Sequence, residues 1–380
     1  MLYREIGDTG RRASVIGLGC EHLDRKPYER VKETIDAALG NGVNILDVFM
    51  PGAEIREDIA KALGERRRDV MIQGHIGATD VRQQYDISRD MPTVKKYFED
   101  MLRIFGGYID FGMMFFIDSE EDYKNVFETE FATYTDKLKK KGDILHIGFS
   151  SHNPITAAKA ISTGLPEMVM FSINPAFDML PSDTYVFDHV EKGFGAELFR
   201  GIDPSRAAFY KLCGQKRIGI TVMKSLGSGK LVTPEHSPFA KPLTVIQCID
   251  YALSRPAVAS VLIGGKTADE VDGAMRYLTC DESEKDYSDI LSGVRYDFSG
   301  NCLYCSHCQP CPADIDIAAV MRILDMACLD ENAVTDAMRS DYAKLEKGGG
   351  NCVGCGNCED RCPFGVKVIA NMEKAAKLLG

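Results

Sequence analysis

Eight of the thirteen cysteines lie in two short runs near the C-terminal end of the sequence. The first run is C-x₂-C-x₂-C-x₂-C-P, from Cys302 to Pro312, and the second is C-x₂-C-x₂-C-x₃-C-P, from Cys352 to Pro363. Where two such runs occur together, three thiolates of a run bind one 4Fe-4S cluster and the fourth binds the other cluster. We therefore predict two 4Fe-4S clusters, one held by Cys302, Cys305, Cys308 and Cys362 and the other by Cys352, Cys355, Cys358 and Cys311.

A structural zinc site is the alternative for these cysteines. Zinc usually takes two C-x₂-C pairs or a mixture of cysteine and histidine, whereas two runs of four thiols suit cubane clusters. The other cysteines form no pattern, since Cys20, Cys213, Cys248 and Cys280 are scattered and Cys328 lies alone between the runs. Two adjacent clusters commonly transfer electrons one at a time, so we expect a redox relay. A purely structural role for the clusters is the weaker alternative.

The sequence before these runs alternates short apolar runs with amphipathic stretches, which predicts alternating strands and helices. Strands are expected at 14–19, 44–49, 70–75, 109–117, 146–151, 168–174, 219–225 and 260–265. Helices are expected at 28–39, 55–63, 94–104, 155–163, 205–215 and 243–253. Strands that are apolar on both faces and separated by helices favour the α/β class and a parallel (β/α)₈ TIM barrel. An open doubly wound sheet is the alternative, but no strand is followed by a G-x-G-x-x-G turn.

The chain of 380 residues is long enough for two domains. We expect the barrel at 1–285 and an α-rich, two-cluster ferredoxin-like domain at 286–380, with a helical insertion at about 314–349 between the cysteine runs. The net charge of −11 disfavours nucleic acid and anionic membranes as partners. No stretch approaches the length of a membrane span, and the first residues are not those of a signal peptide. Grouped thiols indicate a reducing compartment, so we expect a cytoplasmic protein.

Polar side chains follow the predicted strands, at the end of the barrel where chemistry takes place in this fold. An ordinary barrel also has polar residues where strands give way to loops. The whole set of polar residues at these strand ends, called the ring here, is therefore stronger evidence for a site than any single residue. The ring comprises Glu21, His22, Asp47, His75, Asp118, Ser150, Ser151, His152, Asn174, Lys224 and Lys266.

The sequence resembles the aldo-keto reductases, and in particular the branch that carries a C-terminal two-cluster ferredoxin-type domain. The resemblance covers almost the whole chain. It rests on segments that occur in the expected order: 3–7, 15–20, 45–47, 108–110, 117–122, 147–150, 222–226 and the closing Cys362-Pro363-Phe364-Gly365-Val366.

The resemblance is poor at the catalytic centre. The family uses an aspartate, a tyrosine, a lysine and a histidine, of which only the aspartate is kept, as Asp47. Residues 48–53 contain no tyrosine, His75 stands at the lysine position and Phe115 at the histidine position. Reduction of a carbonyl needs a proton donor, and His75 could supply the proton with Asp47 fixing its tautomer. The alternative is that both are relics; His152 and Lys224 are the expected supporting groups.

The residues with which the family binds its nicotinamide cofactor are also only partly kept. Ser150 lies where the family binds the carboxamide, and Lys266 and Thr267 follow the surviving phosphate segment Gly264-Gly265. The adenine-contacting pair of the family reads Ala274-Met275 here. The segment 225–230 resembles a phosphate loop but lacks its first glycine. If NADP(H) or NAD(H) binds, we expect contacts from Ser150, Asn174, Ser225, Gly227, Lys266 and Thr267.

These observations predict an iron–sulfur oxidoreductase. The aldo-keto-reductase-like barrel would act on a small organic substrate, and the clusters would exchange electrons with an external carrier such as ferredoxin. One alternative is a degenerate barrel that serves as an electron-transfer or docking protein. A less favoured alternative is a metal-dependent hydrolase or lyase that uses His22, Asp47, His75 and His152.

Overall fold

The computed structural model describes residues 1–380 except 82–84, 183, 185–187, 189–193, 195–198, 200, 293–297, 331 and 333. The chain divides into two compact units. The first unit comprises Met1–Ile173, Ile218–Ser225 and Val258–Thr279. The second comprises Asn174–Arg217, Leu226–Ala257 and Cys280–Gly380.

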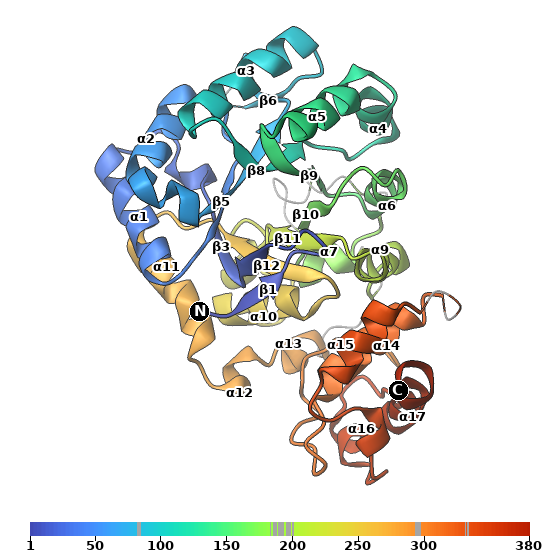
Figure 1. The fold of residues 1–380 in the computed structure, drawn as a ribbon. Coiled ribbons are helices and arrows are strands. Elements are labelled where there is room, and N and C mark those ends of the chain that lie inside the picture. The colour runs from blue at the N-terminus through green and yellow to red at the C-terminus, as the bar shows by residue number, and fades with distance from the viewer. Residues whose placement is uncertain are drawn as a thin grey trace. The chain divides into compact units, whose positions relative to one another are not determined.

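The first unit contains a closed barrel of eight parallel strands, which confirms the expected architecture (Figure 1). Around the barrel the strands follow the order β10-β11-β12-β3-β4-β5-β8-β9. Their bounds are β3 (Ile16–Gly19), β4 (Ile45–Val48), β5 (Met71–Ile76), β8 (Ile109–Met114), β9 (Ile144–Ser151), β10 (Met168–Ser172), β11 (Gly219–Met223) and β12 (Val258–Ile263). Two small antiparallel sheets accompany them, one of β1 (Tyr3–Glu5) and β2 (Arg12–Ser14), the other of β6 (Ala78–Thr79) and β7 (Asp86–Ile87).

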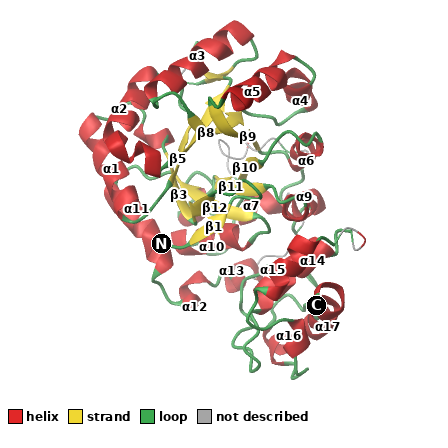
Figure 2. Ribbon diagram, viewed as in Figure 1, coloured by secondary structure: helices red, strands yellow, loops and turns green. Residues whose placement is uncertain are grey.

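Helices of the first unit surround the strands (Figure 2). They are α1 (Tyr28–Gly40), α2 (Ala53–Leu63), α3 (Met91–Ile104), α4 (Glu120–Phe127), α5 (Glu130–Lys141), α6 (Pro154–Ser162) and α11 (Ala268–Met275). Helix α1 packs against α2 and α11. Along the chain every barrel strand is followed by a helix, as the (β/α)₈ fold requires. Local sequence starts these helices: the Asn153 side chain accepts hydrogen bonds from two amides of the first turn of α6, and Pro154 opens that turn.

Methionine side chains form much of the barrel core. Met71, Met113, Met168 and Met170 pack with Phe111 and other apolar residues. Flexible thioethers fill irregular space between strands, which suits a core built from several strand layers. Gly148 of β9 makes room for them, because a Cβ atom at this position would lie 2.4 Å from the Met113 Sδ.

The structure corrects several expected bounds. The strand expected at 109–117 ends at Met114, because Phe116 adopts a left-handed backbone with φ 59° and turns the chain. The strand expected at 168–174 ends at Ser172, and Asn174 instead caps the next helix. The strand expected at 14–19 is divided between β2 and β3. Helices α4, α5 and α11 were not expected from the apolar pattern; polar caps, such as the Ser119–Asp122 capping box of α4, mark where such helices begin.

The second unit is helical in its described part. Its helices are α7 (Pro175–Met179), α9 (Pro204–Gln215), α10 (Val245–Ser254), α12 (Glu282–Lys285), α13 (Ser288–Ser292), α14 (Ile317–Ala327), α15 (Asp336–Ala343), α16 (Asn357–Arg361) and α17 (Val368–Leu379). Helix α14 packs against α9, α15 and α17. A buried Asp178 carboxylate accepts hydrogen bonds from the hydroxyls of Tyr210 at 2.5 Å and Tyr251 at 2.8 Å, and so ties three helices together. None of the helices in the described residues has the length and apolar character that a membrane span requires.

Candidate functional site

The structure brings Asp47 and His75 together at adjacent barrel strands. In the parallel pair β4–β5 the register places Asp47 beside Gln73, and His75 follows two residues later on the same face. The His75 Nε2 lies 2.8 Å from the Asp47 Oδ1, and the Gln73 amide donates to the same oxygen at 3.3 Å. Asp47 and His75 are each only 2% exposed. Because the carboxylate accepts from Nε2, it fixes the orientation of the ring; Nδ1 is buried and has no hydrogen-bond partner among the described residues.

Aromatic rings enclose the imidazole of His75. The Phe115 ring meets it edge to face, with centroids 5.2 Å apart, and the Phe49 ring lies 6.0 Å away. Phe49 also stacks on Phe115 at 5.9 Å and contacts Tyr85 at 5.3 Å. These rings exclude water from one side of the Asp47–His75 pair, which strengthens electrostatic interactions there.

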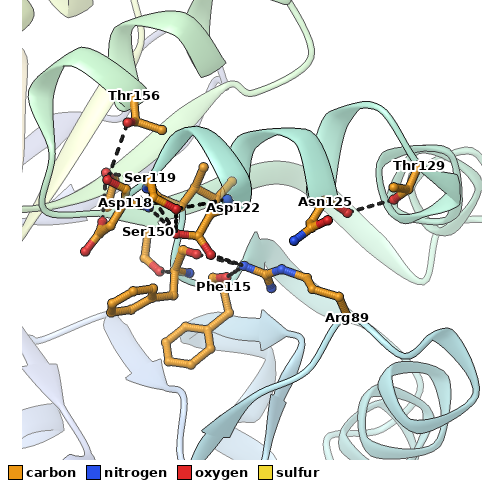
Figure 3. A network of polar contacts seen from close by, with 12 residues as sticks. Arg89, Phe115, Asp118, Ser119, Asp122, Asn125, Thr129, Ser150 and Thr156 are labelled. Atoms are coloured by element: carbon orange, nitrogen blue, oxygen red, sulfur yellow. Dashed lines mark hydrogen bonds and ion pairs between the residues drawn. The ribbon is translucent and has the colours of Figure 1, made fainter.

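The turn that carries Phe115 is held by Arg89, a residue that no motif in the sequence indicated. The Arg89 guanidinium donates to the carbonyl oxygens of Phe115 at 2.8 Å and Phe116 at 2.7 Å. It also lies 3.8 Å from the Asp122 carboxylate, as Figure 3 shows. The Ser150 hydroxyl accepts from the Phe116 amide at 2.9 Å. Together these contacts hold Phe116 in a left-handed conformation that a bulky residue rarely adopts.

A second histidine–carboxylate pair lies at the ends of β8 and β9. The His152 Nδ1 lies 2.8 Å from the Asp118 Oδ2, and the His152 amide donates to Oδ1 at 2.6 Å. The Ser151 hydroxyl adds a hydrogen bond to Oδ1 at 3.1 Å. Burial alone would raise the pKa of Asp118, but the charge and hydrogen bonds of His152 outweigh it and hold that pKa below its usual value.

Lys224 directly follows β11, and three carboxylates act electrostatically on its ammonium group. Burial lowers the pKa of Lys224 from its ordinary value, and Glu21, Asp118 and Asp47 offset only part of that effect. The predicted catalytic residues Asp47, His75, His152 and Lys224 therefore belong to one barrel, as two histidine–carboxylate pairs and a lysine that interacts with both carboxylates.

The predicted phosphate contacts Lys266 and Thr267 serve local roles at the start of α11. The Thr267 hydroxyl accepts from the Glu270 amide at 3.2 Å, and the Lys266 amide donates to the Glu270 carboxylate at 2.8 Å. A carboxylate thus already occupies an amide that a phosphate would use at this helix end.

The remaining predicted dinucleotide contacts do not form one group within the first unit. Ser150 and Ser225 are buried in that unit, and the Ser150 hydroxyl is engaged by the Phe116 amide. Asn174 and Gly227 belong to the second unit, where the Asn174 side chain accepts from the Phe177 amide at 2.9 Å.

The eight cysteines of the two runs line two small cavities in the second unit, both partly open to solvent. One cavity is lined by Cys302, Cys305, Cys308 and Cys362, and is called here the first thiol cavity. The other is lined by Cys311, Cys352, Cys355 and Cys358, and is called the second thiol cavity. Each cavity therefore takes three thiols from one run and the last thiol of the other run. All thirteen cysteines are free thiols.

Among the described residues no group of three or more His, Cys, Asp or Glu side chains could hold a metal ion. Burial raises the pKa of Cys305 to about 11 and that of Cys308 to about 12, so these thiols need neighbouring cations to ionise.

A comparison with protein families matches residues 15–244 to the aldo/keto reductase family. The cysteine runs lie beyond this match. No curated protein matches the sequence of the chain.

Solved aldo-keto reductases share the fold. Aldo-keto reductase AKR11C1 from Bacillus halodurans is 19% identical, with a TM-score of 0.58, and the likeness covers 75% of this chain and 94% of that one. A protein from Pseudomonas aeruginosa that carries the same family name is 18% identical, with a TM-score of 0.54, over 73% of this chain and 96% of that one. At these identities the likeness concerns the fold alone.

Proposed function

This chain belongs to the aldo/keto reductase family, a family of oxidoreductases, and from that premise we propose an iron–sulfur oxidoreductase whose barrel acts on a small organic substrate. Electrons would reach the barrel through two 4Fe-4S clusters. The observation that carries the proposal is that the eight cysteines fall into two sets of four, each of which lines one small cavity.

The crossing of the two runs is the strongest support for clusters over zinc. Two zinc sites would be expected to use neighbouring C-x₂-C pairs, whereas here Cys311 and Cys362 each join the set formed by the other run. That exchange of the last thiol is the arrangement of two-cluster ferredoxins. When bound, such clusters supply one-electron transfer. The chain's own contribution is to hold four thiolates around each cavity and to cover them with apolar side chains.

We assign the role of proton donor in the barrel to His75. Asp47 orients the ring through Nε2, and the doubly protonated ring would give its Nδ1 proton to the oxygen of a carbonyl substrate; reduction to the alcohol would take two electrons, supplied one at a time by the carrier through the clusters, and a second proton from solvent. Phe115 and Phe49 shield the pair from water. Lys224 and the Asp118–His152 pair complete the proposed site as supporting charges.

The contacts at the segment where the family binds the phosphate of its nicotinamide cofactor also support electron supply through the clusters. Members of the family usually bind NAD(P)H, but at the start of α11 the Glu270 carboxylate takes the amide that a phosphate would need. We therefore propose an external carrier such as ferredoxin as the electron partner. We further propose a barrel at 1–285, a two-cluster domain at 286–380 and, because all thirteen cysteines are free thiols, a cytoplasmic location.

Turnover of the reconstituted protein tests this proposal. Anaerobically reconstituted chain is supplied with reduced ferredoxin and a panel of small carbonyl compounds, and loss of the carbonyl is followed. His75→Ala should lower the rate by roughly 10²–10⁴-fold while leaving the clusters intact, because the proton donor is lost. His236→Ala, at an exposed histidine, is the matched control.

Two results would contradict this account. Undiminished turnover in His75→Ala would overturn the assignment of the proton donor. Complete clusters without turnover of any compound would favour the docking protein, which the loss of three of the four family positions also favours.

A further inference from the structure

Arg255 places a buried positive charge beside the first thiol cavity. Its guanidinium donates to the carbonyl oxygen of Leu303, which lies inside the C-x₂-C segment 302–305. The guanidinium carbon also lies 4.9 Å from the centre of the Tyr304 ring. Leu303 and Tyr304 both line the first thiol cavity. Arg255 is only 3% exposed, so its charge is screened little by water.

The surroundings keep this guanidinium in place and charged. The Nη2 that donates to Leu303 also lies 3.2 Å from the Tyr287 hydroxyl and 2.9 Å from the Ser254 hydroxyl, and Nε donates to the Tyr251 carbonyl at 3.2 Å. Tyr287 reinforces the contact, since its hydroxyl donates to the same Leu303 carbonyl at 2.7 Å. Burial alone would lower the pKa of Arg255, but the neighbouring tyrosines and Asp178 outweigh it, and the pKa lies above its ordinary value.

Two carboxylates near the same cavity carry negative charges that oppose the effect of the positive charge of Arg255. Asp325 accepts from the Tyr304 hydroxyl at 2.5 Å, and Asp286 lies 2.5 Å from the Nδ1 of His307. Both aspartates are partly exposed, unlike Arg255, so water screens their charges more strongly.

The second thiol cavity has different surroundings. Apart from its four cysteines and Gly356, its lining consists of apolar side chains, and no charged residue belongs to it. They are Pro310, Pro312, Ile315, Ile317, Val353, Val368, Ile369 and Met372. The Arg361 guanidinium donates to the carbonyl oxygens of Cys308, at the first cavity, and Pro310, at the second, at 2.8 and 2.9 Å, so this partly exposed cation lies beside both cavities, whereas the buried Arg255 contacts only the lining of the first.

We propose that Arg255 raises the reduction potential of the cluster in the first thiol cavity above that of its partner, so that this cluster is the electron acceptor of the pair. This inference rests on the clusters proposed above. Accepting one electron from the carrier makes a cluster one unit more negative, with no bond formed or broken. A nearby fixed cation stabilises that extra negative charge, and net charge and hydrogen bonding are known determinants of cluster potentials.

The test is a redox titration of the full, reconstituted chain, followed by the EPR signals of the reduced clusters. Arg255→Met should lower one of the two potentials and leave the other unchanged. We expect at least a tenfold change in the equilibrium constant for reduction, which is about 59 mV for one electron. Arg255→Lys keeps the charge and should retain most of the potential.

Three further variants separate the effect of the Arg255 charge on the potential from the effect of its packing. Arg255→Gln loses the charge but keeps a donor for Leu303, and it replaces the methionine variant if that protein fails to assemble its clusters. Tyr287→Phe removes a hydrogen bond to Leu303 without changing charge. Arg322→Gln removes a partly exposed cation that donates to the Ser254 carbonyl at 3.3 Å. The last two should shift neither potential by as much as Arg255→Met.

The outcomes distinguish this inference from the proposed function. A wild-type chain that binds no iron overturns both. A chain with both clusters, whose potentials are the same in wild type, Arg255→Met and Arg255→Gln, overturns the role of Arg255 alone. Equal shifts of both potentials, or a shift in Tyr287→Phe as large as in Arg255→Met, also overturn it.

Discussion

Replacing two cysteines at a time separates a crossed from an uncrossed assignment of the thiols. Cys308 and Cys362 line the same cavity although they come from different runs, whereas Cys308 and Cys311 come from one run and line different cavities. The double variant Cys308→Ser/Cys362→Ser leaves the second thiol cavity with all four thiols. The double variant Cys308→Ser/Cys311→Ser leaves each cavity with three.

The expected magnitude follows from these counts. With two complete clusters the wild-type chain holds about eight irons. Cys308→Ser/Cys362→Ser should retain about four irons and the EPR signal of one ordinary reduced 4Fe-4S cluster. Cys308→Ser/Cys311→Ser should retain no cluster with four thiolate ligands and should lose that ordinary signal. Iron and sulfide content and EPR of the dithionite-reduced protein measure both quantities.

The two double variants serve as controls for one another, because each removes the same number of thiols. Cys280→Ser/Cys328→Ser is a further control, since neither residue lines a thiol cavity. It should keep the full iron content. The reverse pattern, with an ordinary cluster in Cys308→Ser/Cys311→Ser and none in Cys308→Ser/Cys362→Ser, would show that each run binds its own cluster and would refute the crossing.

Two further predictions concern the barrel. Arg89→Met removes the donor to the Phe115 and Phe116 carbonyls and should cost about 1–3 kcal/mol, seen as faster amide hydrogen exchange at 115–117. Arg103→Met, at an exposed arginine, should leave that exchange unchanged, and equal exchange in both variants would contradict the role of Arg89. Burial alone would raise the pKa of Glu167, but hydrogen bonds from His146, Lys139 and the Ile147 amide lower it to about 2 from 4.5. The stability that this carboxylate contributes is present above pH 4.5 and is lost as the pH falls toward 2, so Glu167→Gln should flatten acid unfolding in that range; an unchanged acid profile would contradict this.

The sequence was informative where the relevant contacts are set by spacing or by strand order. Strands apolar on both faces predicted the barrel, and neighbouring strand ends predicted the meeting of Asp47 and His75. The cysteines that line each cavity are the same sets of four that the predicted crossing groups together, and the clusters themselves stay a prediction.

Other features depend on contacts between segments that no local pattern connects. Arg89 reaches the turn at Phe115 from 26 residues away, through backbone carbonyls that carry no side-chain signature. Lys266 was expected at a phosphate because the resemblance places it in the phosphate segment of the family; its backbone amide bonds the Glu270 carboxylate, and the expected contact of its side chain stays a prediction. A glutamate four residues later in the first turn of a helix is the signal that could have indicated this.

Arg255 shows a further limit of sequence reasoning. A lone arginine after a helix usually lies at the surface, and nothing in the segment 251–257 indicates burial beside the loop 302–305. The three tyrosines that surround it, Tyr251, Tyr287 and Tyr304, come from three separate segments, so the site exists only in the folded chain.

The most direct test of the account is a reductive titration of the anaerobically reconstituted chain with NADPH, with NADH and, separately, with reduced ferredoxin. Cluster absorption and the EPR signal of reduced 4Fe-4S report the electron uptake. The account predicts that reduced ferredoxin bleaches the clusters and gives the EPR signal, while neither nicotinamide does. A chain that takes up no iron, or clusters that nicotinamide reduces and ferredoxin does not, would contradict it.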